Sequence, residues 1–537
     1  MRPALLLFVS VLMIACQSTP PGPPAANSQP APTPAAAALE ELGVAELQAR
    51  MVRGELSSHG LTQAYLDRIE TLDRTGPRLN AIIAVNPTAL ADAARLDAER
   101  RAGQVRGPLH GIPVLLKDNI DALPMATTAG SLALADNIPP RDAFVVARLR
   151  AAGAVILGKT NLSEWANFRS SHSISGWSGI GGQTRNPYVL DRNPCGSSSG
   201  TGTAIAASLA TVGLGTETDG SIVCPSAVAG LVGLKPTVGL VSRTGIVPIA
   251  ASQDTAGPMT RSVEDAAMVL TALAGTDPAD PATADADRHR VDYTRHLKPE
   301  ALRGARIGVL RKSMGFHPGT DAATEAAIAV LRAAGATVVD AEIPTAGDWN
   351  KAEFEVLLYE FKHGLERYFA SHSSPIQSLD ALIAFNQEHA TQELALFGQD
   401  LLEQAAAKGP LTEADYLSAQ HKARELAGPQ GIDAALESQQ LDALIAPTTA
   451  PAWLTDTVLG DHYLGGSYGA AAVAGYPGIT VPMGDIDGLP VGLLFMGRAY
   501  GEARLIELAY AYEQASHARR RPRYLPTLNA PGYAVPR

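Results

Sequence analysis

Residues 195–237 read CGSSSGTGTAIAASLATVGLGTETDGSIVCPSAVAGLVGLKPT, a run in which glycine stands among small and apolar residues. The surrounding residues 176–245 contain 14 glycines, which is about three times the usual share. In a flexible linker, glycine would stand among polar residues. In an apolar setting it marks a close approach of the backbone or a positive φ angle. The run therefore predicts a packed core built around tight turns.

A helix, a glycine and a strand follow one another in two other places. LRAAGA occurs at 149–154 before VILGKT, and again at 331–336 before TVVDAEI. Each copy predicts a helix closed by glycine and followed by a buried strand, the unit from which mixed α/β sheets are built. LDALIAPTTAP (441–451) and PGITVPMG (477–484) predict further short strands that end in loops marked by proline.

Two segments of the chain have the pattern or composition of helices. The segment LTQAYLDRIETLDR (61–74) predicts an amphipathic helix packed on the core. Its apolar positions on one face are Leu61, Ala64, Tyr65, Ile69 and Leu72. Residues 350–440 are charged and rich in helix formers, and they predict a helical insertion or cap. We expect one folded domain over residues 39–537, with no linker inside it.

The N-terminus has the layout of an export signal, with Arg2, an apolar stretch of 12 residues at 4–15, and Cys16. The apolar stretch is too short to span a bilayer comfortably. Residues 13–16 (MIAC) resemble the lipobox of bacterial lipoproteins, which implies a signal peptide over 1–16 and lipidation of Cys16. A plain secretory signal is the alternative.

Residues 17–38 contain seven prolines among alanine, serine and threonine. Such a segment predicts an extended, disordered tether. Gln17 after the cysteine implies, by the same resemblance, the outer membrane. We therefore expect an exported, periplasmic protein whose contact with the membrane is its N-terminal lipid.

The composition of the chain is that of a folded globular protein. It has 537 residues, 46% of them hydrophobic and 18% charged, and its net charge of −11 is spread without long runs of one sign. A nucleic-acid-binding face would need clustered basic residues, so nucleic acid is excluded as a partner. We expect a small-molecule or peptide ligand and a monomer or homodimer.

The cysteines beyond Cys16 are Cys195 and Cys224. In an oxidising compartment they form a disulfide or remain two buried thiols, and the sequence leaves both alternatives open. Their spacing matches no metal site. We expect neither a metal nor a cofactor.

The triple serine at 197–199 formally matches G-x-S-x-G, the nucleophile elbow of α/β hydrolases, with Ser198 at its centre. An elbow requires a strand that leads into the turn. The preceding residues NPYVLDRNPC contain Pro187 and Pro194, which disfavour a central strand there. Ser198 is therefore a poor candidate for the nucleophile.

Ser221 has a better setting, because it follows Gly220 in GTETDGSIVCPS (215–226) and precedes an apolar run. A serine hydrolase needs N–H donors aimed at the developing oxyanion. Successive backbone N–H groups of a glycine-containing turn form such an anion-binding nest. The candidate donors are Thr218, Asp219, Gly220 and Ser221.

The base that would accept the proton of the serine is not evident among the histidines. None of the 12 lies in either glycine-rich stretch, and the nearest is His172 in a serine-rich loop. Lys117 ends the apolar, strand-like run GIPVLLKDN (111–119). Loss of solvent there would favour the neutral amine, which accepts a proton. A strand-end lysine whose amine reaches water is the alternative.

Three stretches together resemble the amidase signature family: GIPVLLKDN, CGSSSGTGTAIAA (195–207) and GTETDGSIVCPSAVAGLVGLKPT (215–237). The usual family patterns are GIPhxhKDN, GGSSGGSxAA and GTDxGGSIRxPA, and the 24-residue spacing from Ser197 to Ser221 agrees. APTTAPAW, AAAVAGYPGITVPMG and VGLLFMGRAYGEARLIELAYAYE resemble the C-terminal half of the family, so the resemblance covers about residues 40–525. It implies an α/β fold with one large mixed β-sheet covered by helices on both faces.

The resemblance also implies roles. Ser221 would be the nucleophile and Lys117 the base. Ser197, preceded by a cis peptide bond, would relay the proton between them. This chain departs from the family pattern at Cys195 and Ser199, which replace glycines, and at Asp219, where many members have glycine.

These features predict an exported amidase that hydrolyses a carboxylic amide to an acid and ammonia through an acyl-serine. TETDGSIVCP resembles in particular the bacterial peptide amidases, so a C-terminal peptide amide is the favoured substrate. The alternatives are a protein like the A-type subunits of amidotransferases, against which the export signal argues, and a non-catalytic binding lipoprotein of the envelope. Intact Lys117, Ser197 and Ser221 argue against the latter.

Overall fold

The computed structural model describes residues 39–372 and 374–528. All of these belong to one compact unit. The expected signal peptide (1–16), its Cys16 and the expected tether (17–38) lie outside the described residues. In the described part of the chain, no helix combines the length and the apolar character needed to cross a membrane.

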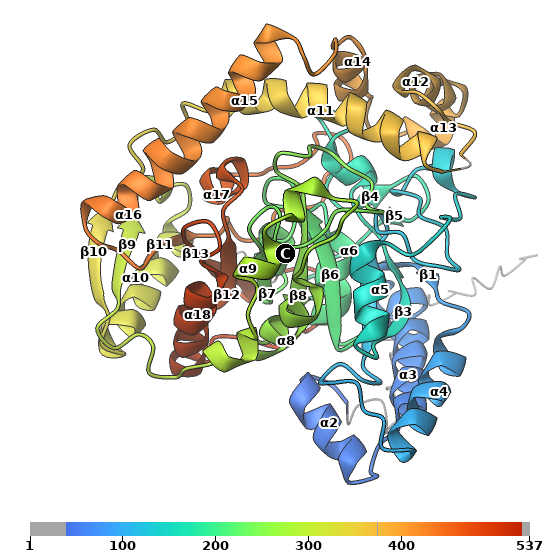
Figure 1. Ribbon diagram of the computed structural model, residues 1–537, viewed down its shortest axis with the longest axis horizontal. Helices are drawn as coiled ribbons and strands as arrows, with labels where there is room; N and C mark the ends of the chain where they lie inside the picture. The colour runs from blue at the N-terminus through green and yellow to red at the C-terminus, as the bar shows by residue number, and fades with distance from the viewer. Residues whose placement is uncertain (1–38, 373, 529–537) are drawn as a thin grey trace, which may run out of the picture. The chain divides into compact units, whose positions relative to one another are not determined.

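The core is one mixed sheet of 11 strands (Figure 1). Across the sheet the order is β1-β3-β2-β6-β8-β7-β12-β13-β11-β9-β10. The strands are β1 (Ile82–Val85), β2 (Pro113–Lys117), β3 (Val155–Thr160), β6 (Val212–Glu217), β7 (Val232–Lys235), β8 (Thr255–Thr260), β9 (Arg306–Leu310), β10 (Thr337–Ala341), β11 (Ala443–Pro447), β12 (Gly478–Ile486) and β13 (Leu489–Met496). A small second sheet pairs β4 (Trp177–Ser178) with β5 (Gly182–Gln183).

Parallel pairing occurs towards both edges of the large sheet. β3, β2 and β6 run parallel to one another, as do β11, β9 and β10. The strands between these groups pair antiparallel from β6 to β11. Every residue of β2, β3, β6, β7 and β8 is buried, which agrees with a sheet covered by helices on both faces.

The helices of the core surround this sheet. Near the N-terminus, α3 continues into a π-helical turn at Ile69–Arg74, and all five residues predicted to face the core are buried. The core helices are α2 (Val44–Val52), α3 (Ser58–Arg68), α4 (Ala89–Arg101), α5 (Phe144–Ala151), α6 (Ser199–Ala206), α7 (Val223–Val228), α8 (Val263–Leu273), α9 (Ala286–His289), α10 (Pro318–Ala333), α17 (Gly469–Ala474) and α18 (Glu502–Ser516).

The helical insertion predicted for residues 350–440 is present. In Figure 1 its longest helices, α11 and α15, form the upper edge of the view, and they pack against each other. Its helices are α11 (Asn350–Ala370), α12 (Leu379–Glu388), α13 (Ala390–Glu393), α14 (Asp400–Ala406), α15 (Ala414–Ala427) and α16 (Ala434–Ser438).

Both LRAAGA segments form the predicted helix, glycine and strand. Gly153 links α5 to β3, and Gly335 links α10 to β10, with φ angles of 85° and 99° that only glycine adopts readily. One part of the prediction is wrong. β10 is only partly buried, because it is the last strand of the sheet and has a neighbour on one side alone.

Candidate active site

Lys117 lies at the end of β2 with its side chain fully buried. Its Nζ is 2.7 Å from Ser197 Oγ, 2.9 Å from Thr216 Oγ1 and 3.3 Å from the Thr216 carbonyl oxygen. No carboxylate is hydrogen-bonded to this amine among the described residues. Burial lowers the pKa of Lys117 to about 7, although the carboxylates of Asp254 and Glu217 partly oppose this. The alternative of an amine that reaches water is therefore wrong.

Thr216 holds this lysine, and Asn119 in turn holds Thr216; neither role was predicted from the sequence. Thr216 Oγ1 also accepts a hydrogen bond from Asn119 Nδ2 at 2.9 Å, so one hydroxyl joins the end of β6 to the residues after β2. β2 and β6 are parallel neighbours, which is why their ends meet. Both residues belong to the quoted motifs, and the place of Asn119, two residues after Lys117, was an available signal.

Ser197 and Ser198 have different environments, although they are adjacent. The peptide bond between Gly196 and Ser197 is cis, and a Cβ atom at Gly196 would lie 2.2 Å from Ser163 Oγ. Ser198 is fully buried, and its Oγ donates to the Thr216 carbonyl at 3.1 Å. No strand leads into this turn. The structure therefore excludes an exposed nucleophile elbow at Ser198.

Ser221 lies in the loop between β6 and α7 with 7% of its surface exposed. Gly220 has a φ angle of 82°, and a Cβ atom there would lie 2.2 Å from the ring of Tyr468. Position 220 therefore requires glycine for two reasons: the positive φ angle disfavours any other residue, and the ring of Tyr468 leaves no space for a Cβ atom. The Glu217 carboxylate fixes the far side of the loop by accepting hydrogen bonds from the N–H groups of Ile222 and Val223, at 2.7 and 3.0 Å.

The four predicted oxyanion donors differ in whether their N–H groups already have a hydrogen-bond acceptor within the protein. The N–H of Gly220 interacts with the Glu217 carboxylate. Among the described residues, the N–H groups of Thr218, Asp219 and Ser221 have no intramolecular acceptor. These three groups are the ones left for an oxyanion.

The loops that carry Ser197 and Ser221 are joined in two ways. The N–H of Ser198 donates to the carbonyl oxygen of Ser221 at 3.2 Å. Cys195 and Cys224 form a disulfide with a Cα–Cα distance of 6.1 Å. This resolves the alternative that the sequence left open. The residue two positions before Ser197 is covalently attached to the residue three positions after Ser221.

Loss of this disulfide is expected to lower the stability of the protein. The bond closes a loop of 29 residues, and loop-closure entropy for that length corresponds to about 3–4 kcal/mol. The double variant Cys195→Gly and Cys224→Ala should lose about this much unfolding free energy in urea titrations. Each single variant should lose as much as the pair, because either change breaks the bond. An unchanged urea midpoint would contradict the expected contribution.

Asp219 and Glu353 bring two carboxyl groups together beside the Ser221 loop. Burial and the Glu353 carboxylate raise the pKa of Asp219 well above its usual value, and burial also raises the pKa of Glu353. Gln253 Nε2 donates to Glu353 Oε1 at 3.0 Å and to the Thr218 carbonyl at 3.3 Å. Asp219 Oδ1 is buried without a hydrogen-bond partner. Glu353 comes from α11, and no sequence motif pointed to it.

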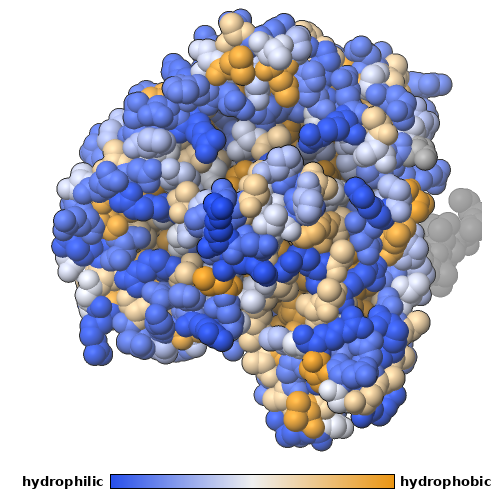
Figure 2. All heavy atoms as spheres, in the orientation of Figure 1, coloured by the Kyte–Doolittle hydropathy of each residue, from blue (hydrophilic) through white to orange (hydrophobic). Residues whose placement is uncertain are grey.

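A cavity of about 660 Å³ reaches the residues next to Lys117. Its lining includes Asn119, Thr216 and Thr218, together with Asp254. Asp254 Oδ2 accepts hydrogen bonds from two backbone N–H groups of the loop at 249–250. A volume of this size is typical of small-molecule sites. Figure 2 also shows a hollow in the surface below α11 and α15.

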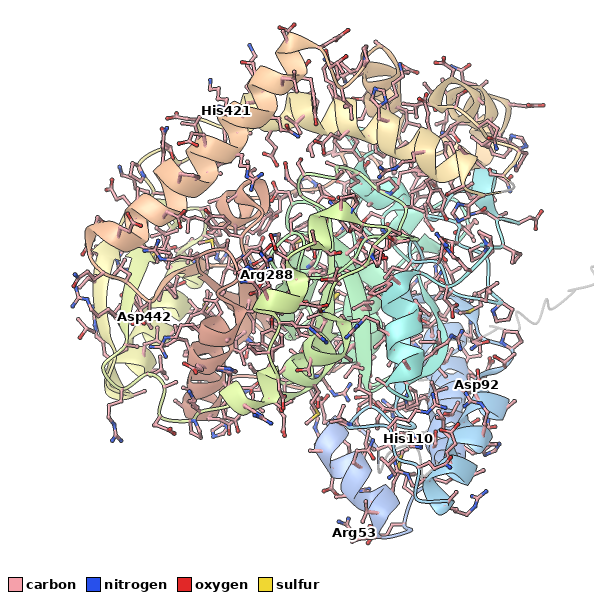
Figure 3. The ribbon with its side chains drawn as sticks, in the orientation of Figure 1. Arg53, Asp92, His110, Arg288, His421 and Asp442 are labelled. Carbon is pink, nitrogen blue, oxygen red and sulfur yellow. A yellow bond between two sulfur atoms is a disulfide. The ribbon has the colours of Figure 1, made fainter. Side chains whose placement is uncertain are left out.

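The histidines lie outside the contacts of Lys117, although one of them, His372, lines the cavity of about 660 Å³. His110 and His421, labelled in Figure 3, come from opposite parts of the fold. His110 is buried and its Nε2 is 2.9 Å from the Leu96 carbonyl, while His421 on α15 lines a second cavity of about 520 Å³. His172 pairs with the neighbouring Ser171 at 3.0 Å. Within the described residues no histidine is hydrogen-bonded to Lys117, Ser197 or Ser221.

Comparison with known proteins gives consistent matches over almost the whole chain. The family model named Amidase matches residues 60–506. A probable amidase of Arabidopsis thaliana, At4g34880, is 40% identical over 501 residues, which are 91% of this chain and 92% of that protein. The crystal structure of the native peptide amidase from Stenotrophomonas maltophilia superposes with a TM-score of 0.87 at 62% identity, covering 90% of this chain and 99% of that one.

An A-type subunit of the glutamyl-tRNA(Gln) amidotransferase of Synechococcus is 36% identical over 502 residues, covering 89% of this chain and 92% of that protein. Residues 60–506, which the family model matches, include β2, the cis-serine turn and the Ser221 loop. On this evidence the chain belongs to the amidase family, and it is a hydrolase that acts on amide bonds.

Proposed function

We propose that Ser221 is the nucleophile, that Ser197 relays its proton, and that Lys117 is the base. The observation that carries the proposal is the contact of 2.7 Å between Lys117 Nζ and Ser197 Oγ, at a fully buried lysine with no carboxylate hydrogen-bonded to it in the described chain. Burial without a paired carboxylate favours the neutral amine. A neutral lysine has the lone pair that a base requires.

The hydrogen-bond inventory of a neutral Lys117 supports this arrangement. Its two N–H groups donate to the carbonyl oxygen and to Oγ1 of Thr216. Its lone pair then accepts the hydroxyl proton of Ser197 at 2.7 Å. The oxygen of Ser197 is left free to accept the proton of Ser221. Because Thr216 occupies both N–H groups of the neutral amine, the lone pair of Lys117 is the part left for the proton of Ser197.

In the proposed reaction, Ser221 Oγ attacks the amide carbon and its proton passes through Ser197 to Lys117. The carbonyl oxygen becomes an oxyanion held by backbone N–H groups at 218–221, with Thr218, Asp219 and Ser221 as the free donors. The C–N bond breaks as the proton returns through Ser197 to the nitrogen, and ammonia leaves. Water then attacks the acyl-serine by the same proton path and releases the acid.

We further propose that the substrate is a peptide amide, cleaved at its C-terminal carboxamide. The similarity to the Stenotrophomonas maltophilia enzyme supports this. The test is release of ammonia from peptide amides, fatty amides, aryl amides and glutamine. Peptide amides should have the highest kcat/KM by at least tenfold. A preference for glutamine would favour the reaction of an amidotransferase, and a preference for fatty or aryl amides would contradict the proposal.

The activity should fall as the pH drops through the pKa of Lys117, which is about 7. Below this pH the amine is protonated and has no lone pair, so the relay cannot start. Above it the amine is neutral and kcat/KM reaches a plateau. A pH profile of kcat/KM on an uncharged peptide amide measures the acid limb. A flat profile from pH 5 to pH 8 would contradict the role of neutral Lys117.

Ser198→Ala should retain activity within about tenfold of the unmodified enzyme. Ser198 forms hydrogen bonds with the backbone of β6 and has no proposed contact with the substrate. Its Oγ donates to the Thr216 carbonyl and accepts from the Thr216 N–H at 3.3 Å. Removal of this buried hydroxyl should reduce the unfolding free energy by about 1–3 kcal/mol. Kinetics and urea titration on the same preparation separate the two effects. Loss of turnover with unchanged stability would restore Ser198 as a candidate nucleophile.

We also propose that the protein is exported and anchored by a lipid on Cys16, after removal of residues 1–15, with residues 17–38 as its tether. The apolar stretch before Cys16 and the prolines after it support this proposal. Metabolic labelling with palmitate should mark the protein, and Cys16→Ser should abolish the label. Labelling that persists in Cys16→Ser would contradict it.

A further inference from the structure

An unusual group of exposed apolar side chains lies on the loop at 454–464, here called the apolar loop. Of the 13 large apolar side chains that are exposed among the described residues, five fall within these 11 positions. The other eight are spread over α2, β1, α11, α15 and single loop positions, and such isolated residues are normal. The apolar loop comprises Leu454, Val458, Leu459, Tyr463 and Leu464, which are 40–88% exposed.

The conformation of the apolar loop is fixed by two aspartates. Asp456 Oδ1 accepts hydrogen bonds from the N–H groups of Val458 and Leu459, both at 2.9 Å, and its Oδ2 is 2.9 Å from His462 Nε2. Asp461 Oδ1 accepts from Trp453 Nε1 at 3.2 Å. The apolar side chains are thus held towards solvent by a preformed backbone. Preformed apolar surface costs little ordering when a ligand covers it.

The same loop is attached to both catalytic segments. Tyr463 Oη and Tyr468 Oη are 2.6 Å apart, and the ring of Tyr468 fills the space above Gly220, next to Ser221. On the other side, Asp461 Oδ1 accepts from Asn193 Nδ2 at 2.9 Å. The side chain of Asn193 in turn accepts from the N–H of Cys195 at 2.8 Å. The apolar loop is therefore continuous with the loops of Ser197 and Ser221.

The charges of the loop favour an apolar, uncharged occupant. Residues 454–464 contain no lysine or arginine. The two carboxylates, Asp456 and Asp461, are engaged within the loop or with the Ser197 side of the site. A contiguous exposed apolar group on a soluble protein commonly marks a binding surface.

We propose that the apolar loop binds apolar side chains of the peptide that precede the C-terminal amide, and so selects apolar peptide amides. The proposal rests on the proposed function, because it assigns a place to the acyl part of that substrate. Contact between the loop and upstream side chains lowers KM. It leaves kcat unchanged, because the loop touches neither the carboxamide nor the proton relay. Single amino-acid amides are too short to reach the loop and gain nothing from it.

The test uses the double variant Val458→Ser and Leu459→Ser in the full chain. Both side chains are largely exposed, at 88% and 74%, so the fold should not be affected. The matched control is Val52→Ser, which is 77% exposed on α2. In Figure 1, α2 lies at the bottom of the view and α17, the helix that follows Tyr468, lies above the middle. The substrates are a tetrapeptide amide with leucine and phenylalanine upstream and N-acetylalaninamide.

In the proposed complex the peptide covers Val458 and Leu459. Loss of these two apolar contacts should raise KM for the tetrapeptide amide about tenfold. The value for N-acetylalaninamide, kcat for both substrates and all parameters of Val52→Ser should stay unchanged. An unchanged KM for the tetrapeptide amide would overturn the proposal while leaving peptide amidase activity intact. An equal loss on both substrates would also overturn it, since that points to the catalytic centre.

Three further outcomes separate the remaining explanations. An unmodified enzyme that cleaves fatty or aryl amides but no peptide amide would overturn the proposed substrate, and this inference with it. A double variant with unchanged KM that no longer sediments with vesicles of phosphatidylethanolamine and phosphatidylglycerol would overturn the inference in favour of a membrane-binding loop. Retention of vesicle binding together with a raised KM supports the peptide site.

Discussion

Ser221→Ala is expected to abolish hydrolysis of every amide that the enzyme cleaves, with a loss of at least about 10⁴-fold in kcat. The hydroxyl is the atom that forms the acyl-enzyme, and no neighbouring group can replace it. Ser197 Oγ contacts Lys117, and Ser198 Oγ is engaged by the backbone of Thr216. Steady-state ammonia release, with single-turnover assays at high enzyme concentration, measures the residual rate.

The fold of Ser221→Ala should be intact. The contacts that shape its loop are made by the Glu217 carboxylate and by the Ser221 carbonyl oxygen, which the substitution retains. The urea midpoint should therefore match that of the unmodified protein. Ser198→Ala is the matched control, because it also removes one serine hydroxyl and is expected to remain active. Equal losses in the two variants would contradict the assignment of Ser221.

Lys117→Met is expected to reduce kcat/KM by about 10³-fold or more, because a general base contributes on the order of 10²–10⁴ and the relay through Ser197 has no other acceptor. The buried methionine occupies a similar volume without an amine that must be desolvated. Stability should therefore be unchanged or increased. The acid limb of the pH profile should disappear from the residual activity. A residual rate with the original acid limb would show that another group titrates.

Lys159 provides the contrast on the neighbouring strand. It is also fully buried, but its Nζ forms an ion pair of 2.8 Å with Asp118. Lys159→Met would leave the Asp118 carboxylate buried and unpaired, which costs about 3–5 kcal/mol. We therefore expect this variant to lose stability, measured by urea titration. Replacement of Lys117 should therefore abolish the reaction, whereas replacement of Lys159 should destabilise the fold.

The sequence predicted those parts of the site that lie within short continuous motifs. Lys117 ends an apolar strand, and the two glycine-rich turns carry Ser197 and Ser221. Each motif therefore predicts the backbone conformation of its own residues. Their mutual position followed only from the resemblance to a family. The insertion at 350–440 was recognisable as helical from its composition, because helix formers and the absence of strand patterns are local properties.

Contacts between distant segments could not be predicted in this way. Glu353 reaches the Ser221 loop from α11, and Tyr468 covers Gly220 from the segment before α17. Neither has a periodic or spacing signal. The spacing of Cys195 and Cys224 likewise gave no information on their separation in space. The exposure of β10 depends on its place at the sheet edge, which its own residues do not encode.

The assignment of Ser221 as the nucleophile is tested most directly by locating the covalent adduct of a fluorophosphonate by mass spectrometry of proteolytic peptides. We expect one adduct on Ser221 in the unmodified enzyme and in Ser198→Ala. We expect none in Ser221→Ala, and strongly slowed labelling of Ser221 in Lys117→Met. An adduct on Ser197 or Ser198, or labelling that is independent of Ser221, would contradict the assignment.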